Sequence, residues 1–267
     1  MTLPTTDTLL LREDGPFLHV TLNRPDARNA MSLAMVNELM AVFEAIADSN
    51  DIRAVVLRGS NGHFCAGGDI KDMAGARMKA ASGDADAYFQ LNRRFGEMIT
   101  LANRLPQVLV TVIEGAVLGG GFGLACISDV AIAAEDAQFG LPETGLGVIP
   151  AQIAPFVVQR IGLTQARRLA LTGARFNGSE AARLGIVHEA VPAAELDGRL
   201  DATLKQIRRC APHANRVTKQ LVLAVGEQPL GNLLDQAARD FAAAVASDEG
   251  AEGTLAFVQK RLPNWAE

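Results

Sequence analysis

The chain has 267 residues, of which 49% are hydrophobic and 21% charged, and its formal net charge is −5. This composition predicts a packed globular core, and the negative net charge excludes a general affinity for nucleic acid or an anionic membrane. Three scattered cysteines fit neither a disulfide framework nor a zinc site, and they favour the reducing cytoplasm. We expect no secretory leader and no membrane-spanning segment, because no suitable apolar run is present.

Apolar patterning predicts alternating strands and helices over the first three quarters of the chain. The continuous apolar runs at 54–59 and 108–115 are typical of buried strands. Ser32 is a predicted N-cap for a helix with apolar residues at helical spacing. The small and polar residues of 74–87 predict a mobile segment. Further strands are expected at 17–25, 129–134, 137–140 and 186–192, and further helices at 88–105, 153–162, 164–173 and 179–185.

From Ala193 onward the pattern is almost entirely helical, with interruptions at Pro212 and Pro229. Alternating strands and helices followed by helices alone indicate an α/β core with a helical appendage. We therefore expect a core that carries the active site over residues 1–200 and a helical region over 201–267.

Two glycine-rich loops share one design, since each follows a buried strand and precedes a helix. They are HFCAGGDI at 63–70 and AVLGGGFGL at 116–124. A helix beginning beyond such a loop presents unpaired N–H groups, so two converging loops could place two donors on one oxygen, as an oxyanion hole does. Taken singly, each loop is better explained by tight helix–sheet packing. A dinucleotide fingerprint is excluded because the glycine pattern ends in Cys126, and no P-loop lysine follows either loop.

Glu143 follows Pro142 in a glycine-rich turn flanked by apolar residues. A carboxyl group in dry surroundings would have a raised pKa and could transfer protons, although its turn position favours an ordinary solvated glutamate. The histidines lack metal-ligand spacing, so no metal site is expected, and the serines lack a nucleophile elbow. Helix capping or ion pairing accounts for Asp69 and Asp129.

The order and spacing of these motifs resemble the crotonase, or enoyl-CoA hydratase/isomerase, superfamily over nearly the whole chain. The resemblance lies in LNRPDARNAMS at 22–32, AVVLRGSNGHFCAGGDIKDM at 54–73, the long segment EGAVLGGGFGLACISDVAIAAEDAQFGLPETGLGVIP at 114–150, and FVQKRLP at 257–263. It implies an α/β spiral of ββα turns, with the C-terminal helices forming a homotrimer or a hexamer (a dimer of trimers). The implied ligand is an acyl-coenzyme A, which is the substrate, so no separate cofactor is expected.

The resemblance also implies roles for particular residues. The N–H groups of Gly68 and Gly120 match the two oxyanion donors, and Glu143 matches a catalytic glutamate. The residues that match the coenzyme A-binding positions are Ala27, Arg28, Ala30, Ala66, Asp69, Ile70, Phe257 and Lys260, with Arg261 beside the last as a second phosphate-binding cation.

Gly123 is the main departure from the family pattern, because typical enoyl-CoA hydratases carry a first catalytic glutamate at this position. One remaining carboxylate suits a Δ3–Δ2 enoyl-CoA isomerase, which moves one proton between carbons. However, IPAQIAPFVVQRIG at 149–162 is similar to bacterial hydratases of branched glutaconyl-CoA esters. We hypothesise that the distal carboxylate of such a substrate helps to position the water.

The sequence therefore predicts an enoyl-CoA hydratase with a branched glutaconyl-type substrate, such as 3-methylglutaconyl-CoA or isohexenylglutaconyl-CoA. The alternatives are an enoyl-CoA isomerase that uses the same residues and a catalytically silent protein that binds CoA thioesters.

Overall fold

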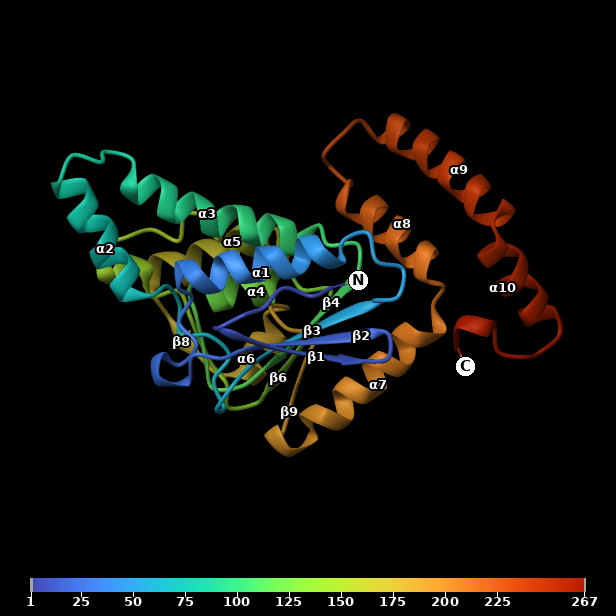
Figure 1. The fold of residues 1–267 in the computed structure, drawn as a ribbon, viewed down its shortest axis with the longest axis horizontal. Helices are drawn as coiled ribbons and strands as arrows, with labels where there is room; N and C mark the ends of the chain where they lie inside the picture. The colour runs from blue at the N-terminus through green and yellow to red at the C-terminus, as the bar shows by residue number, and fades with distance from the viewer. Residues whose placement is uncertain (1, 267) are drawn as a thin grey trace.

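The computed structural model describes residues 2–266 and places the strands in two sheets (Figure 1). In the larger sheet the strand order is β1-β2-β3-β4-β6-β9, with β1 and β2 antiparallel and the following neighbours parallel. The smaller sheet has the order β5-β7-β8. The strands are β1 (Leu9–Asp14), β2 (Phe17–Leu22), β3 (Ala54–Gly59), β4 (Val108–Ile113), β5 (Ala116–Leu118), β6 (Val130–Ala134), β7 (Gln138–Gly140), β8 (Arg175–Phe176) and β9 (Glu189–Val191).

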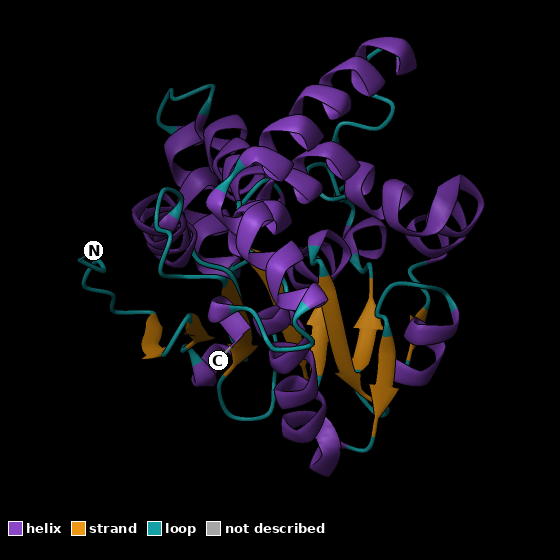
Figure 2. Cartoon of the chain, turned by 90° about the vertical axis from the view of Figure 1, so that its right-hand side faces the viewer, coloured by secondary structure: helices purple, strands orange, loops and turns teal. Residues whose placement is uncertain are grey.

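The helices α1, α3, α4 and α5 gather along one side of the strands, and Figure 2 shows this helical layer above the sheet. Helix α7 packs against β4 and β6. The α-helices are α1 (Leu33–Ile46), α2 (Ile70–Ala81), α3 (Ala87–Asn103), α4 (Gly120–Ile127), α5 (Ala154–Thr172), α6 (Gly178–Arg183), α7 (Leu196–Arg209), α8 (Pro212–Leu223), α9 (Leu230–Ala246) and α10 (Asp248–Val258). Short 3-10 helices are η1 (Pro25–Ala27), η2 (Glu143–Leu146), η3 (Ala193–Glu195) and η4 (Asn264–Ala266).

The predicted α/β core is confirmed, and its elements form for the reasons that the sequence suggests. Strands β3 and β4 are buried on both faces over most of their length, as expected for central parallel strands. Helix α1 begins after Ser32, whose hydroxyl accepts a hydrogen bond from the Met35 N–H at 3.2 Å. The expected helices at 153–162 and 164–173 meet at Gly162, whose backbone (φ 73°) breaks α5.

The loop character expected at 74–87 is wrong, because most of the segment is helical, whereas its mobility stays a prediction. Helix α2 continues to Ala81 and α3 already begins at Ala87, so only a short turn separates them. Asp69 caps α2, since its Oδ1 accepts from the Lys71 N–H at 2.7 Å. The alanines, Arg77, Met78 and Lys79 of this segment are good helix formers, and a helix that buries only Ala76 needs no apolar stripe.

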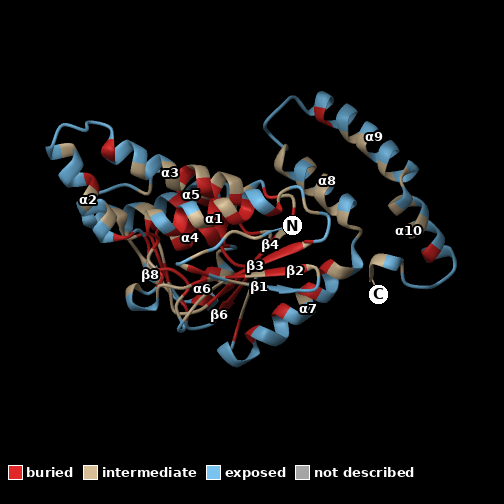
Figure 3. Cartoon of the chain, in the orientation of Figure 1, coloured by how far each residue is buried: buried red, intermediate tan, exposed pale blue. Residues whose placement is uncertain are grey.

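The C-terminal helices α8, α9 and α10, here called the arm, extend away from the sheets (Figure 1). Figure 3 shows that the arm is mostly exposed, whereas the buried residues gather in the strands and the helices beside them. The predicted boundary between residues 200 and 201 falls within α7. Buried residues of α7 lie on both sides of that boundary, at Leu196, Leu200, Leu204 and Ile207, and the division into two domains stays a prediction.

Arg53, which precedes β3, binds both ends of the C-terminal region. Its guanidinium donates to the carbonyl oxygens of Trp265 at 2.7 Å and Arg208 at 2.8 Å, and also to the carbonyl of Cys210. The Trp265 indole N–H donates to the Arg209 carbonyl at 3.2 Å. The last described residues are therefore held at the end of α7.

A buried ion pair joins α8 to the core. The Lys219 ammonium donates to Asp129 Oδ2 at 2.6 Å and to the Gln107 carbonyl at 3.0 Å, and Asp129 Oδ2 also accepts from the Leu109 N–H at 2.7 Å. The side chains of Lys219 and Asp129 are only 10% and 27% exposed. This ion pair fixes α8 against the chain between β4 and β6.

Replacing Lys219 by Met should lower the free energy of unfolding by about 2 kcal/mol, somewhat below the range of about 3–5 kcal/mol for a fully buried pair that loses one partner. The change leaves the Asp129 carboxylate with a single N–H donor. Urea unfolding measures the loss, with Lys205→Met, on an exposed part of α7, as the control. Adding Asp129→Asn should recover part of the stability, and equal effects at 205 and 219 would contradict this role of the pair.

Candidate active site

Backbone hydrogen bonds hold the two glycine-rich loops together. The Cys65 N–H donates to the Ala116 carbonyl and the Leu118 N–H donates to the Cys65 carbonyl, both at 2.9 Å. On the other side, the Met31 N–H donates to the Gly67 carbonyl at 2.7 Å. The loops after β3 and β5 and the chain before α1 therefore form one layer of paired backbone.

The loops also come into contact at Gly67 and Gly119. Both have positive φ angles, 100° and 48°, and a Cβ on Gly119 would lie 3.6 Å from the Cα of Gly67, so glycine is needed there. Within residues 2–266, the N–H groups of Gly68 and Gly120 donate no hydrogen bond. Gly120 is also the first residue of α4, where the helix dipole favours a negative charge. The arrangement fits the predicted oxyanion hole.

Glu143 begins η2, and its carboxyl group lies against the second loop. Its Oε1 is 2.8 Å from where a Cβ on Gly119 would lie, and its Oε2 is buried without a hydrogen-bond partner among the described residues. Burial raises the pKa of the Glu143 carboxyl above its ordinary value, and the hydrogen bond from its own N–H only partly offsets this. A half-buried carboxyl group beside the loop that carries the Gly120 N–H can take up and return a proton at an adjacent atom.

Apolar side chains occupy the space next to Gly123. A Cβ there would lie 2.4 Å from Ile153 Cγ2 and 3.1 Å from Ile99 Cδ1, and Ile153 is only 3% exposed. The structure thus shows that position 123 lacks a carboxylate and also lacks the room for one. Ile153 was not predicted as a site residue, because its contact with Gly123 of α4 joins segments that are separate in the sequence.

The aromatic ring of Phe95 lies beside Gly120. A Cβ on Gly120 would be 3.1 Å from Phe95 Cε2, so the ring covers the start of α4. The sequence analysis did not identify Phe95. The sequence places Phe95 on the apolar face of α3, but this pattern does not indicate which part of the fold that face contacts.

Most of the predicted coenzyme A-binding residues lie together around the loop before α1. Ala27 ends η1, and the Ala66 N–H donates to the Arg28 carbonyl at 3.0 Å. Ala30 accepts a hydrogen bond from Arg24 through its carbonyl oxygen, and Ile70, the first residue of α2, is 80% exposed.

Asn29 holds this loop in place, although it was not predicted. Arg28 and Asn29 both have positive φ angles, 47° and 56°, a conformation that Asn tolerates better than most residues. The fully buried Asn29 amide donates to the carbonyls of His63 at 2.7 Å and Ser60 at 3.0 Å. The oxygen of the same amide group, Asn29 Oδ1, accepts a hydrogen bond from the Arg24 N–H at 2.9 Å.

Asp69 is only 7% exposed and pairs with Arg24 at 2.5 Å. Burial pushes the pKa of the Asp69 carboxyl upward, but the hydrogen bonds from Arg24 and the Lys71 N–H, with the charges of both side chains, lower it overall. Asp69 therefore stays ionised and holds the loop before α1 against the start of α2.

Phe257 and Lys260 are not brought to these loops within one chain. Phe257 is 85% exposed and Lys260 follows α10, which packs mainly against α9. Their contact with coenzyme A stays a prediction.

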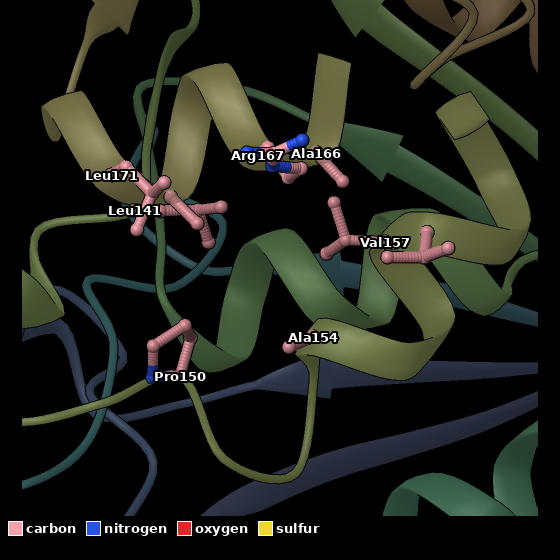
Figure 4. Close-up of a pocket in the computed structure, with 9 residues that line it drawn as sticks. Leu141, Pro150, Ala154, Val157, Ala166, Arg167 and Leu171 are labelled. Atoms are coloured by element: carbon pink, nitrogen blue, oxygen red, sulfur yellow. The ribbon is translucent and has the colours of Figure 1, made fainter. Parts of the chain in front are cut away.

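An apolar cavity of about 180 Å³ lies between the segment after Glu143 and α5 (Figure 4). Its lining contains no carboxyl group, so it holds no candidate for proton transfer; the lining residues are Leu141, Pro150, Ala154, Val157, Val158, Ala166, Arg167, Ala170 and Leu171. Over residues 2–266, no cluster of His, Cys, Asp or Glu is arranged to hold a metal. In the same range no helix combines the length and apolar character that crossing a bilayer requires.

The chain is an α/β enzyme with the crotonase fold, as comparisons with known proteins show. A family model described as "Enoyl-CoA hydratase/isomerase" matches residues 13–267. "Probable enoyl-CoA hydratase echA8" of Mycobacterium tuberculosis is 36% identical over 263 residues, which cover 98% of each chain. Solved structures include Pseudomonas aeruginosa AtuE, with 65% identity, a TM-score of 0.94 and coverage of 98% of this chain and 100% of that one. An enoyl-CoA hydratase/isomerase from Marinobacter aquaeolei has 57% identity, a TM-score of 0.93 and coverage of 97% and 99%.

The chain therefore belongs to the enoyl-CoA hydratase/isomerase family, and the resemblance described from its sequence is confirmed.

Replacing Gly123 by Ala should lower the free energy of unfolding by about 1–3 kcal/mol, the usual cost of an extra carbon in a packed core. Nothing lies within 4 Å of a Cβ on Gly198 in α7, so Gly198→Ala should instead gain up to about 1 kcal/mol from helix propensity. Chemical denaturation compares the two variants. A gain in stability at both positions would show that Ile153 moves aside freely.

The raised pKa of Glu143 gives a pH dependence of opposite sign to that of an ion-paired carboxylate. Between the ordinary pKa of 4.5 and the raised pKa, the unfolded chain is ionised while the folded carboxyl group keeps its proton. Folding stability therefore decreases as pH rises through that window. Urea unfolding from about pH 5 to about pH 8 should show Glu143→Gln gaining stability relative to the wild type and then reaching a plateau. A constant difference would contradict the shift.

Proposed function

We propose that this enzyme adds water across the double bond of a 2-enoyl-CoA thioester, with a branched glutaconyl-type ester such as 3-methylglutaconyl-CoA or its isohexenyl analogue as substrate. The observation that carries the proposal is the position of the half-buried Glu143 carboxyl group beside the loop that presents the Gly120 N–H, with its Oε2 buried and without a hydrogen-bond partner among the described residues. Acid–base chemistry next to a thioester oxygen needs this combination of groups.

In the proposed reaction, the N–H groups of Gly68 and Gly120 hold the thioester oxygen. The Glu143 carboxylate takes a proton from water as the water oxygen bonds to C3, and the π electrons move through C2 to the thioester oxygen. The protonated Glu143 then gives its proton to C2 and the thioester carbonyl re-forms. Water is added in full, and each oxyanion donor contributes a factor of about 10²–10³ in rate.

Glu143 has no second carboxylate to share the water with, because Ile153 and Ile99 pack against Gly123. A substrate with its own distal carboxylate offers a second acceptor for the water's hydrogens. We therefore keep the glutaconyl-type ester, which supplies that carboxylate, as the preferred substrate.

The second candidate is a Δ3–Δ2 enoyl-CoA isomerase, and the apolar contact of Ile153 with Gly123 favours it. There Glu143 would take a proton from C2 and return it at C4, with no water involved. The third candidate, a catalytically silent binder, leaves the raised pKa of Glu143 without a role.

The proposal for binding assigns coenzyme A to the loop around Arg28 and Ala66, with Phe257 and Lys260 at its nucleotide end. Coenzyme A is part of the substrate, so the proposed reaction uses no further cofactor. The cytoplasm is the proposed location, because Cys65, Cys126 and Cys210 are all free thiols.

Assembly into a homotrimer, or a hexamer formed from two trimers, is part of the proposal. The arm exposes large apolar side chains, which are costly to leave in water. They include Leu230, Leu234, Phe241 and Val245 on α9, each more than half exposed, and Leu255, Phe257 and Val258 on α10.

Incubation with candidate enoyl-CoA esters in ¹⁸O-labelled water tests the reaction, with products followed by mass. A hydratase incorporates the label, an isomerase moves the double bond without it, and a silent binder leaves each ester unchanged. Glu143→Gln should reduce turnover by about 10²–10⁴-fold while ester binding is retained.

Full activity in the Glu143→Gln variant would overturn the assignment of Glu143. Product formation without label would replace the hydratase by the isomerase. Glu135→Gln, in the exposed turn between β6 and β7, is the matched control and should leave turnover unchanged.

A further inference from the structure

One face of α3 lies along the candidate active site, with Ile99 at its buried end and Asn92 at its exposed end. Ile99 contacts the position of Gly123, and Phe95 contacts that of Gly120 at the start of α4. Residues at i, i+3 and i+7 share one helix face, so Asn92 lies on this face one turn beyond Phe95. Apolar residues line the deep part of the face, and polar residues begin at Asn92.

Three polar side chains, here called the amide–guanidinium cluster, converge at that outer turn. They are Asn92, Arg93 and Gln152. The Gln152 Nε2 donates to Asn92 Oδ1 at 2.9 Å. A Cβ on Gly96 would lie 1.9 Å from Gln152 Oε1 and 2.7 Å from Arg93 Nη1, so both side chains lie directly over this buried glycine.

Arg93 differs from its neighbour Arg94 in having no hydrogen-bond or ion-pair partner among residues 2–266. The Arg94 guanidinium donates to Asn37 at 2.7 Å and pairs with Glu97 at 3.0 Å. Over residues 2–266, the Arg93 guanidinium makes neither a hydrogen bond nor an ion pair. Its Nη1 lies over Gly96 beside the Gln152 amide, and none of the described carboxylates pairs with it.

The spacing matches the length of a short dicarboxylic acyl group. One helix turn, from Phe95 to Asn92, advances about 5 Å along α3. The thioester carbon and the distal carboxylate carbon of a five-carbon diacyl group are also separated by about 5 Å when extended. If such a group extends along α3 with its thioester oxygen at the Gly120 N–H, its far carboxylate reaches the level of Asn92 and hence of the amide–guanidinium cluster.

We infer that Arg93, supported by Asn92 and Gln152, binds the distal carboxylate of the acyl group and so selects dicarboxylic over neutral acyl-CoA esters. This inference rests on the proposed function and names the residue that determines its substrate class. A guanidinium offers paired N–H donors that match the two oxygens of a carboxylate. The Gln152–Asn92 hydrogen bond fixes the amide beside it.

Gly96 makes the cluster possible, because any side chain there would displace the Gln152 amide. The cluster therefore depends on a residue that contacts no substrate itself. Asn92 and Gln152 are positioning residues, and Arg93 is the specificity-determining residue.

Binding of two saturated esters with the same number of acyl carbons, glutaryl-CoA and pentanoyl-CoA, tests the inference. Neither has a double bond, so isothermal titration calorimetry measures affinity without turnover. Arg93→Gln should weaken glutaryl-CoA binding by about 10–100-fold, the usual value of a charge-assisted hydrogen bond, and change pentanoyl-CoA binding by less than about twofold. Arg93→Lys keeps the charge and should recover part of the affinity.

Arg94→Gln is the matched control, because it removes the same charge from the same helix at a side chain that contacts Asn37 on α1. It should leave the ratio of the two affinities unchanged. Gly96→Ala should lower that ratio without removing any charge. Melting temperatures confirm that each variant is folded.

Equal losses for both esters, or no loss for either, would overturn the inference. The result is independent of the reaction catalysed. If the ¹⁸O experiment shows no label but Arg93→Gln still weakens glutaryl-CoA binding selectively, the hydration proposal fails and the carboxylate site stands. If label is incorporated but Arg93→Gln weakens both esters equally, the hydration proposal stands and the carboxylate site is ruled out.

Discussion

The close approach of Gly67 to Gly119 is the constraint on which the candidate site depends. Two parallel segments pair through Cys65, Ala116 and Leu118, and this pairing brings two glycine loops into contact. Because both loops turn through left-handed backbone, the N–H groups of the residues that follow have no hydrogen-bond partners in the part of the chain that the structure describes. The sheet supplies the rigidity and the glycines supply the space, so the proposed oxygen-binding position is built entirely from backbone.

Around this fixed position, a few side chains determine the chemistry. Glu143 contributes a carboxyl group whose pKa is raised by burial, and the packing of Ile153 against Gly123 leaves no room for a second one. One proton-transfer group next to apolar side chains such as Ile153 offers little means of distinguishing one acyl group from another. Discrimination among substrates must then come from groups farther along the acyl chain.

The sequence predicts the buried strands, the capped helix α1 and the family well, because each rests on a local pattern. It fails at residues 74–87, where small helix formers without an apolar stripe resemble a loop. Phe95, Ile153 and Asn29 escape sequence reasoning for a different reason: their roles come from contacts between segments far apart in the chain. Phe257 and Lys260 remain predictions, since one chain alone does not bring them to the loops.

Arg53 makes the C-terminal region a closed loop rather than a free tail. Its hydrogen bond to Trp265 joins residues 212 positions apart, and the same guanidinium holds the end of α7. Contacts of such separation form late, because they carry a large loop-closure entropy. During synthesis Arg53 is made 212 residues before Trp265. The segment after α10 therefore cannot reach its place at the end of α7 until Trp265 has been made.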